Sequence, residues 1–438
     1  MYRQSQLTQL LSGRRILIAG YGREGKSTHA LLNKILDGER VDIACNDEEI
    51  FAHLDQARCQ DDPYDLIIKS PGISTMKFEG RCELNTITSQ TDLFLQVYHD
   101  ITVGVTGTKG KSTTTTLIHH VLKHSIPGCN VVLAGNMGIP LFDILDQLND
   151  HSRVVAEFSC HQLENIHCSP HVSVILNLYQ EHLDHYHSYH DYQMAKMQIA
   201  LHQDAHDACF LGGDSQDLMD LLRSDELCLL SRSAIFTYQD ALNDGIDKLS
   251  TTLTGRHNIT NIYVAKLVAE FLSVSSDQFA EALASFRGLP HRLQQVGTYH
   301  GITFYNDSIS TIPEACIAAM EALPQVDTVI LGGFDRGIDY SPLGNYLVDH
   351  PHLPRNIVFV GKAGARMHEE WSARNDNPLA DRNVLLESDY EVIVQWCYQH
   401  TAPGSVCLLS PAAASYDAFK NFEHRGQVFE ELILKYNK

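Results

Sequence analysis

Short runs of apolar, often β-branched residues recur along the chain, and glycine-rich turns and helical patterns follow most of them. These runs cover residues 14–20, 64–70, 101–107, 171–178, 327–333, 356–364 and 405–415. Because the runs lack the alternation of a half-exposed strand, they predict buried parallel strands separated by helices. Open parallel sheets bind ligands at the carboxyl ends of their strands. The pattern therefore predicts an α/β protein whose reactive residues lie just after its strands.

The length of 438 residues is too great for one ordinary core. At roughly 150 residues per domain it suggests about three domains. The segments 95–101 and 286–296 each precede a fresh strand–loop–helix unit. We predict domain boundaries there, which gives domains at residues 1–97, 98–290 and 291–438.

The chain is acidic, with a net charge of −21 from 33 basic and 54 acidic residues. Nucleic-acid binding relies on basic surfaces, so we expect no nucleic-acid partner, and any anion site must be local. No apolar run approaches the roughly 18–20 residues that span a bilayer. The first residues lack the apolar core of a signal peptide. These features predict a cytoplasmic protein that does not insert into a membrane.

Two glycine-rich loops end in Gly-Lys-Ser-Thr, the ending of a phosphate-binding loop. The second, "GVTGTKGKSTTTT", follows a predicted strand and opens a helix. Gly107 and Gly110 would let backbone N–H groups surround phosphate oxygens. Lys111 adds a positive charge, and the hydroxyl of Ser112 or Thr113 can reach Mg²⁺. This loop lacks the first glycine of the full triphosphate pattern, and a serine-capped glycine turn is the alternative.

The first loop, "AGYGREGKST", satisfies two patterns on the same residues. It fits the triphosphate pattern G-x-x-x-x-G-K-[ST], and Gly20, Gly22 and Gly25 also fit the dinucleotide fingerprint G-x-G-x-x-G. Asp47 follows at about the 20-residue spacing at which that fingerprint places a ribose contact. The motif alone cannot decide between a nucleotide site and a structural turn.

Acidic and imidazole groups follow two strands in the middle of the chain. Glu157 ends one predicted strand and His182 follows another, a combination suited to Mg²⁺ beside a phosphate loop. The run of His182, His185, His187 and His190 raises zinc as an alternative, but only two or three could share a face and no cysteine lies nearby. The eleven cysteines include no C-x-x-C pair, which predicts reduced, mostly buried thiols.

Motif blocks along nearly the whole chain resemble the Mur ligase family, and the last two favour its glutamate-adding branch. The blocks are "DLIIKSPGI", "TGTKGKSTTT", "AGNMGIP", "EFSCHQLE", "LNLYQEHLDHY", "YQMAKMQI", "TGRHNITNIYVA", "GLPHRLQQV", "NDSISTIPEA", "LGGFDRGIDYSPL" and "LLSPAAASYDAFKNFEHRG". The resemblance implies a Rossmann-like first domain that binds a UDP-sugar, a central P-loop-type domain that binds ATP, and a Rossmann-like C-terminal domain that binds an amino acid.

The implied reaction is ATP-driven amide synthesis in peptidoglycan precursor synthesis. ATP would phosphorylate the alanyl carboxylate of UDP-N-acetylmuramoyl-L-alanine, and the amine of D-glutamate would attack the acyl phosphate. The resemblance implies two Mg²⁺ ions, ATP as co-substrate and a monomer in the bacterial cytoplasm. Stabilisation of the charge that develops would supply the largest part of catalysis.

The resemblance places catalysis and ATP on the following residues. Lys111, Glu157, His182 and Lys196 are the expected catalytic residues. ATP would contact Gly107, Thr108, Lys109, Gly110, Lys111, Ser112, Thr113, Asn258, Asn261, Arg292 and Asp307, and metal would contact Ser112, Glu157, His182 and Lys196 if it is carbamylated. By residue type alone, Lys196 would be a solvated helix lysine. Helix capping could explain Asn258 and Asn261, and an Asx turn could explain Asp307.

The resemblance also assigns the two other substrates. The UDP-sugar would contact Gly22, Arg23, Asn46, Asp47, Ser70, Pro71, Gly72, Asn136, Ser159 and Gln162, with the choice between Asn46 and Asp47 left open. Local turn bonds could instead explain Ser159. Glutamate would contact Thr311, Arg336, Ser415 and Phe422. Arg336 is the natural partner for a side-chain carboxylate, and its alternative is a surface salt bridge.

Three positions depart from the family pattern. Lys109 replaces an asparagine in the ATP loop, and Glu181 replaces another acidic residue. Ile309 stands where many glutamate-adding members have lysine, which removes one cation from the glutamate pocket. The choice between D-glutamate, L-glutamate and another amino acid therefore stays open.

Other protein classes leave parts of the sequence unused. An NAD-dependent dehydrogenase would use "GYGREG" but give no role to the second loop, Glu157, His182 or Arg292. A P-loop motor or switch would want a Walker-B aspartate, and a folate-type ligase would not be expected to retain the "SPAAASYDAFKNF" ending. Retention of the expected catalytic residues argues against an inactive binding protein.

Overall fold

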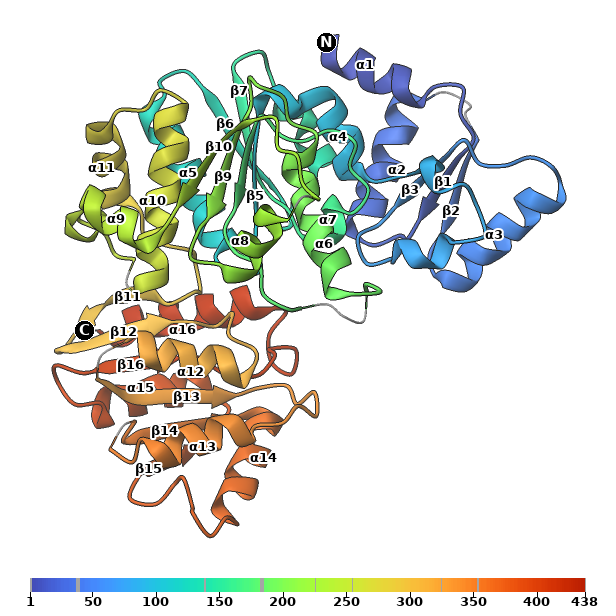
Figure 1. Ribbon diagram of the computed structural model, residues 1–438. Helices are drawn as coiled ribbons and strands as arrows, with labels where there is room; N and C mark the ends of the chain where they lie inside the picture. The colour runs from blue at the N-terminus through green and yellow to red at the C-terminus, as the bar shows by residue number, and fades with distance from the viewer. Residues whose placement is uncertain are drawn as a thin grey trace. The chain divides into compact units, whose positions relative to one another are not determined.

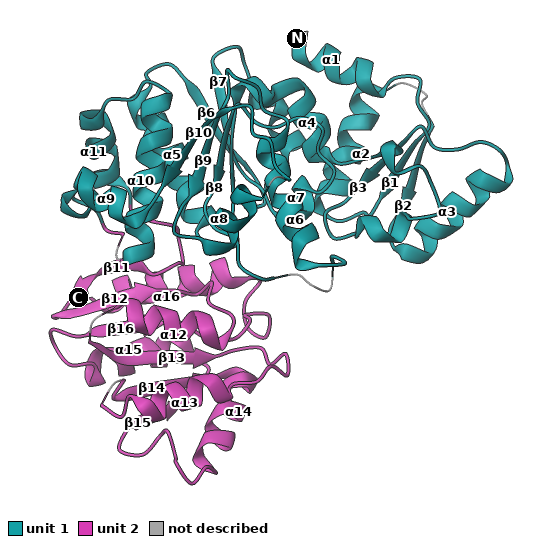
Figure 2. Cartoon of the chain, viewed as in Figure 1, with its two compact units in different colours: residues 1–251, 256–286 teal, residues 252–255, 287–438 magenta. Residues whose placement is uncertain are grey.

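A computed structural model describes residues 2–36, 40–137, 139–181, 185–224, 226–253, 255–323, 325–352 and 354–437 (Figure 1). The described residues form three sheets, built mainly on the strand–loop–helix plan that the apolar runs predict. It divides into two compact units, residues 1–251 with 256–286 and residues 252–255 with 287–438 (Figure 2). The α/β class is therefore confirmed.

The first sheet of unit 1 has the parallel strand order β2-β1-β3-β4. Its strands are β1 (Ile16–Ala19), β2 (Val41–Ala44), β3 (Leu66–Lys69) and β4 (Ile87–Thr88). The helical segments are α1 (Tyr2–Leu11), α2 (Arg23–Ile35), α3 (Asp47–Cys59), η1 (Thr75–Phe78), η2 (Leu84–Thr86), α4 (Gln90–Tyr98) and η3 (His99–Ile101). Side chains that accept backbone N–H bonds at helix starts, such as Asn46 before α3 and Ser89 before α4, fix where these helices begin.

The second sheet of unit 1 is also parallel, with the order β10-β9-β8-β5-β7-β6. Its strands are β5 (Thr102–Thr106), β6 (Asn130–Gly135), β7 (Ser152–Glu157), β8 (Val172–Ile175), β9 (Ala208–Gly212) and β10 (Arg232–Phe236). The helical segments are α5 (Lys111–Ser125), η4 (Leu141–Gln147), α6 (Cys160–Leu163), α7 (Tyr189–Leu201), α8 (Gln216–Arg223), α9 (Tyr238–Asp244), η5 (Ile246–Lys248), α10 (Arg256–Phe271) and α11 (Ser276–Ser285). The central strand β5 leads directly into the predicted ATP loop.

One hydrophobic cluster joins the two sheets of unit 1. Ile18 of the first sheet, Phe94 of α4 and Val154 of the second sheet all belong to it, and none of the three is exposed. Because this core crosses residue 97, the two halves form one compact unit. The predicted domain boundary at residue 97 stays a prediction.

The sheet of unit 2 has the order β11-β12-β16-β13-β14-β15, with β11 antiparallel to β12 and the other pairs parallel. Its strands are β11 (Gln294–Tyr299), β12 (Ile302–Asn306), β13 (Val326–Gly332), β14 (Asn356–Val360), β15 (Asn383–Leu386) and β16 (Val406–Leu409). Its helices are α12 (Pro313–Ala322), α13 (Ser341–Asp349), α14 (Gly361–Ser372), α15 (Tyr390–His400) and α16 (Phe422–Tyr436).

The two faces of this sheet are both buried, as continuous apolar strands require. Along β13, Val329 and Leu331 pack in the cluster with α12, α13 and α14, whereas Ile330 packs in the cluster with α15 and α16. Alternate residues of β13 therefore pack against the helices on opposite faces of the sheet.

Two composition-based expectations can be compared with the structure. All cysteines are reduced, but only Cys160, Cys209, Cys316, Cys397 and Cys407 are buried. The prediction of mostly buried thiols is therefore wrong, because the other thiols lie on loops or on the outer faces of surface elements.

In the described part of the chain, every helix is too short or too polar to cross a membrane.

Candidate functional site

The predicted ATP loop lies between β5 and α5 and has the backbone of a phosphate-binding turn. Gly107 and Gly110 have φ values of 147° and 85°, which favour glycine. A Cβ atom on Gly110 would lie 2.9 Å from Oδ1 of Asn261, so the loop and the start of α10 are in close contact. The structure thus brings Asn261, one of the expected ATP residues, to the loop. Asn258 accepts a hydrogen bond from Asn261 Nδ2 at 3.2 Å.

Asn177, which the motif analysis did not single out, holds this loop in shape. Its Oδ1 accepts hydrogen bonds from the backbone N–H groups of Thr108 at 3.1 Å and Lys109 at 2.8 Å. Its Nδ2 donates to the carbonyl of Lys109 at 3.1 Å. Asn177 follows β8, the neighbour of β5, and its place just after a strand was the available signal.

Two ammonium groups converge on one carbonyl of the loop. Nζ of Lys111 donates to the Gly107 carbonyl at 2.9 Å, and Nζ of Lys196 donates to the same oxygen at 3.0 Å. Lys196 is 2% exposed, so the expectation of a solvated helix lysine is wrong. The inward face of α7 packs against β5 and β8 and carries Lys196 into the site.

Burial has a direct electrostatic effect on Lys196. Because a buried ammonium loses its hydration, burial lowers the pKa of Lys196 to about 8, and the charge of Lys111 acts in the same direction. With this pKa, about one tenth of the amine is unprotonated at pH 7, far more than for an ordinary lysine, and the unprotonated amine is the nucleophilic form.

Glu157 ends β7 at the same edge of the sheet and is only 2% exposed. Its Oε1 accepts a hydrogen bond from Asn136 Nδ2 at 2.7 Å, whereas its Oε2 is buried and has no hydrogen-bond partner among the described residues. A buried carboxylate oxygen without a donor is costly unless a cation meets it. The donor set fits a hard divalent cation, which prefers oxygen ligands.

The three histidines of the run that the structure describes, His185, His187 and His190, each have a different acidic neighbour. His182 lies outside the described residues. His185 Nε2 lies 3.5 Å from Glu164, His187 pairs with Glu79, and His190 pairs with Glu226. Across the residues that the structure places, we find no group of three or more His, Cys, Asp or Glu side chains arranged to hold a metal.

A pocket of about 370 Å³ lies between the two sheets of unit 1. Six of the residues predicted to contact the UDP-sugar line it, namely Gly22, Arg23, Ser70, Pro71, Gly72 and Asn136. Gly20, Tyr21, Glu24, Cys45, Ile73, Gly135 and Pro140 complete the lining. Asn136 lines this pocket and also bonds to Glu157, so the pocket adjoins the phosphate-loop edge.

The first glycine loop lines part of this pocket. The residues that match its triphosphate pattern make packing contacts and hydrogen bonds within the protein. A Cβ atom on Gly25 would lie 2.1 Å from the carbonyl of Gly20, so Gly25 permits close packing of α2 on the turn. Ser27, which the triphosphate pattern would aim at Mg²⁺, instead donates to Asp143 at 2.6 Å. The fingerprint interpretation accounts for these residues better than the triphosphate pattern does.

The remaining residues predicted for the UDP-sugar have partners within the protein. Asn46 caps α3, and Asp47 forms an ion pair with Lys77 at 2.6 Å. Ser159 and Gln162 form a capping box at the start of α6. Gln162 Nε2 also donates to Glu24 of the pocket at 2.6 Å.

In unit 2, Asp307 is held in a buried polar pocket. Its carboxylate accepts from the N–H of Leu293 at 3.0 Å and from the hydroxyl of Ser410 at 2.8 Å. Burial raises the pKa of Asp307 to about 6, although these bonds and the nearby charge of Arg292 oppose the rise. The Asx-type bond proposed as an alternative for Asp307 belongs to Asn306, which accepts from the N–H of Ser308 at 3.1 Å.

The residues predicted for glutamate also lie in unit 2. Arg336 is exposed and donates to the carbonyl of Thr311 at 2.8 Å, so these two residues are brought together. Ser415 is buried, and Phe422 begins α16. The Phe422 carbonyl accepts from the hydroxyl of Ser308 at 2.8 Å, which links the start of α16 to the loop of Asp307.

A buried arginine that the motif analysis missed joins the loops of unit 2. Arg425 is 1% exposed and donates to the carbonyls of Ser308 at 2.7 Å, Ala413 at 3.1 Å and Ala414 at 3.2 Å. Its Nε also donates to the hydroxyl of Ser308 at 2.9 Å. The block "FEHRG" contained it, but only its burial identifies its role.

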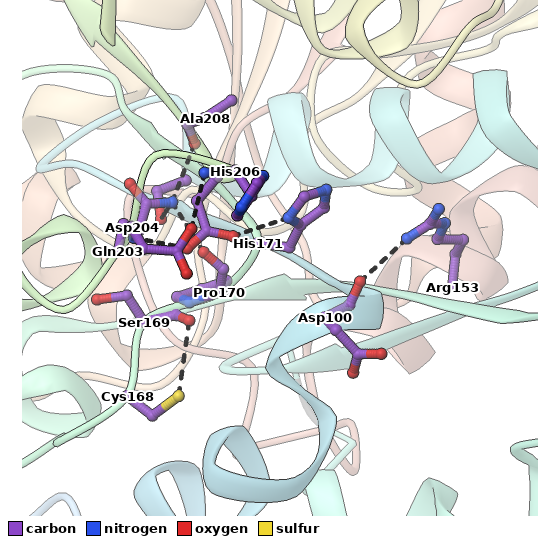
Figure 3. A network of polar contacts seen from close by, with 12 residues as sticks. Asp100, Arg153, Cys168, Ser169, Pro170, His171, Gln203, Asp204, His206 and Ala208 are labelled. Carbon is purple, nitrogen blue, oxygen red and sulfur yellow. Dashed lines mark hydrogen bonds and ion pairs between the residues drawn. The ribbon is translucent and has the colours of Figure 1, made fainter. Parts of the chain in front are cut away.

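A separate polar network lies at the amino ends of β8 and β9, away from the phosphate loop (Figure 3). His171 and Asp207, which directly precede these strands, pair at 2.8 Å. Gln203 donates to the carbonyls of Pro170 at 2.8 Å and Ala208 at 3.0 Å. These groups bond to one another and hold the amino ends of β8 and β9 together, so we assign them a structural role.

The chain resembles known proteins over nearly its whole length. A family model described as the Mur ligase middle domain matches residues 105–269. A UDP-N-acetylmuramoylalanine–D-glutamate ligase of Oenococcus oeni is 32% identical over 441 residues, covering 96% of this chain and 97% of that protein. The chain belongs to the UDP-N-acetylmuramoylalanine–D-glutamate ligase family. A family member from Solibacter usitatus is 31% identical over 84% of each chain.

Solved structures of other Mur ligases share the fold of this UDP-N-acetylmuramoylalanine–D-glutamate ligase family member. MurF of Acinetobacter baumannii matches with a TM-score of 0.59 and 15% identity, covering 99% of this chain and 98% of that one. MurF of Thermotoga maritima in complex with ADP matches with a TM-score of 0.55 and 17% identity, covering 96% and 95%. Membership of this ligase family sets aside the dehydrogenase alternative for "GYGREG".

Proposed function

We propose that this protein joins D-glutamate to the alanyl carboxylate of UDP-N-acetylmuramoyl-L-alanine and converts ATP to ADP and phosphate. The observation that carries the proposal is the position of Asn136. It lines the pocket between the two sheets and donates to Glu157 beside the phosphate loop. A sugar nucleotide in the pocket and a nucleoside triphosphate at the loop would thus share one wall.

The phosphate loop supports the first chemical step. Lys111 donates to the carbonyls of Gly107 and Thr108, and phosphate oxygens would replace these weaker acceptors. The alanyl carboxylate then attacks the γ-phosphorus, ADP leaves, and an acyl phosphate forms. Backbone N–H groups at the start of α5 and the Lys111 ammonium stabilise the transferring phosphoryl group.

The second step joins the amino acid. The unprotonated amine of glutamate attacks the acyl carbon, a tetrahedral intermediate forms, and inorganic phosphate leaves as the amide bond is made. The amine loses a proton in this step. Arg336 is assigned to the side-chain carboxylate of glutamate, together with Thr311, Ser415 and Phe422. Arg292 and Asp307 are assigned to ATP.

The residues at the loop fit Mg²⁺. Glu157, whose buried Oε2 accepts no hydrogen bond from any described residue, and Ser112 at the start of α5 would hold one ion, and His182 is assigned as a further ligand. When bound, Mg²⁺ supplies charge neutralisation between the phosphate groups and the carboxylate. Carbamylation of Lys196, in which the unprotonated amine would attack CO₂ and release one proton, would replace one of two adjacent cations by an anion that could hold a second Mg²⁺. The burial and lowered pKa of Lys196 support this assignment.

We assign D-glutamate as the amino acid, although Ile309 removes a cation that many glutamate-adding members carry. We also expect a cytoplasmic monomer that uses only small-molecule substrates. The test is phosphate release from ATP in the presence of UDP-N-acetylmuramoyl-L-alanine, with D-glutamate, L-glutamate and other amino acids compared in parallel. Release that requires both the sugar nucleotide and D-glutamate supports the assignment. Strict dependence on L-glutamate would overturn the choice of isomer, and NAD binding without phosphate release would overturn the proposal.

A further inference from the structure

A buried ion pair links the first sheet of unit 1 to Glu164, which directly follows α6 in the second-sheet region. Lys69, the last residue of β3, has a side chain only 1% exposed, and its Nζ lies 2.8 Å from Oε2 of Glu164. The same Nζ donates to the carbonyl of Ile73 at 2.7 Å. Ser70 to Ile73 form one wall of the pocket assigned to the UDP-sugar. Lys69 therefore bonds the far end of this wall and fixes it to Glu164.

His185 completes the group around Glu164. Its Nε2 lies 3.5 Å from the same carboxylate oxygen, and its ring lies 4.0 Å from that of His161 in α6. The backbone carbonyl of His185 accepts a hydrogen bond from Ser74 at 2.9 Å, just beyond the pocket wall. Burial alone would raise the pKa of Glu164, but the His185 imidazole and the Lys69 ammonium together lower it to about 2. The carboxylate is thus held ionised.

The opposite wall of the pocket is hydrogen-bonded to α6, the short helix directly before Glu164. Gln162, two residues before Glu164, donates to Oε1 of Glu24 at 2.6 Å, and Glu24 lines the pocket on the side of the first glycine loop. The chain that enters α6 comes from Glu157 at the end of β7. One short segment after the catalytic strand therefore contacts both walls of the pocket.

We propose that Lys69 and Glu164, with His185 beside them, are positioning residues that set the Ser70–Ile73 wall in register with the catalytic edge of the central sheet. This inference rests on the proposed function for its substrate. A buried charge pair fixes a separation more strictly than apolar packing does, because either charge left alone in the interior is strongly unfavourable. Small displacements of a bound substrate are costly in reactions that depend on alignment.

The decisive variant is the double replacement Lys69→Met with Glu164→Gln, which removes both charges and leaves none unpaired. We expect this variant to fold with a Tm near that of the wild type, and calorimetry to show UDP-N-acetylmuramoyl-L-alanine binding weakened by about tenfold. The single variant Lys69→Arg retains the cation and should recover most of the affinity. The KM for ATP should not change. A folded double variant with wild-type affinity would overturn the proposal.

A matched control exists in the same unit. Lys34 and Asp146 also pair at 2.7 Å between the first-sheet and second-sheet regions, but both are exposed and neither lines the pocket. Lys34→Met with Asp146→Asn should leave sugar-nucleotide binding unchanged, and an equal loss in this variant would also overturn the proposal.

Hydrogen exchange in ligand-free protein separates this inference from the proposed function. Faster exchange of the Gly72 and Ile73 amides in the Lys69/Glu164 variant, but not in the Lys34/Asp146 variant, supports the positioning role even if the wild type lacks ligase activity. Unchanged exchange at these amides contradicts it even if the wild type is active.

Discussion

Asn136 donates a 2.7 Å hydrogen bond from Nδ2 to Oε1 of Glu157, and the N–H of Asn136 also donates to the carbonyl of Glu157. These bonds join the carboxyl ends of β6 and β7 and leave Oε2 of Glu157 without a partner in the part of the chain that the structure describes. Asn136 thereby orients the carboxylate that we assign to Mg²⁺, and it also lines the pocket that we assign to the sugar nucleotide. In the proposed function, the sugar nucleotide and ATP would therefore both lie beside this amide.

Asn136→Ala should lower kcat by about 10- to 100-fold, the effect seen when a partner that orients a metal ligand is removed. The Mg²⁺ concentration needed for half-maximal activity should rise, because Glu157 is no longer oriented. The control is Asn130→Ala at the amino end of the same strand, where the amide bonds to Gln147 and Ser152. Steady-state phosphate release over a Mg²⁺ titration measures both effects, and equal losses in the two variants would contradict the assignment.

Lys111→Ala should lower kcat by about 100- to 1000-fold, because it removes a charged donor from the transferring phosphoryl group. Lys123→Ala removes an exposed lysine from the last turn of the same helix and should have no effect. Lys26→Ala tests the other loop and should leave the KM for ATP unchanged. If Lys26→Ala and Lys111→Ala weaken ATP binding equally, the division of the two loops is wrong.

Lys196→Met should stabilise the ligand-free protein at neutral pH in CO₂-depleted buffer. The folded protein lowers the pKa of Lys196 from 10.5 to about 8, so the unfolded chain binds its proton more tightly. The loss of stability caused by the buried ammonium is fully present below pH about 8, where it is on the order of 3 kcal/mol. This loss disappears as the pH rises toward about 10.5. Urea unfolding at pH 7 and pH 10 should show a stability difference that shrinks at the higher pH.

Ser410→Ala should move the acid limb of the kcat/KM profile for ATP to higher pH. Asp307 has a pKa raised by burial to about 6, and the Ser410 hydroxyl donates to its carboxylate and opposes that rise. Loss of this donor favours the protonated carboxyl, so activity should fall at a higher pH than in the wild type. Ser405→Ala, just before β16, is the control. Overlapping profiles between pH 5 and 8 would show that Asp307 ionisation does not limit ATP use.

Arg425→Lys should lower the free energy of unfolding of the protein by about 2–3 kcal/mol. The guanidinium donates hydrogen bonds to the carbonyls of Ser308, Ala413 and Ala414. A lysine ammonium cannot reproduce this planar arrangement of donors. Arg374→Lys, where the arginine pairs with Asp376 at the surface, should change stability by less than about 0.5 kcal/mol. Chemical denaturation of both variants measures the difference, and equal small changes would show that the Arg425 bonds contribute little.

The sequence by itself determined the α/β class, the positions of the predicted strands and the family. Continuous apolar runs specify buried parallel strands, because only strands covered on both faces lack alternation. It also predicted that Glu157 would end a strand near a glycine loop, since chain order and strand ends are local properties. The ordered motif blocks indicated the ligase family without any knowledge of packing.

Only the tertiary structure decided which charged groups are buried and what they contact. Lys196 has the local sequence of a surface helix lysine, yet α7 turns it toward Gly107, which is far away in the chain. The pairing of Lys69 with Glu164 and the contact of Gly25 with Gly20 likewise depend on how distant segments meet. Local patterns encode backbone conformation and periodicity, whereas burial and electrostatic environment arise from contacts between elements that the chain order does not specify.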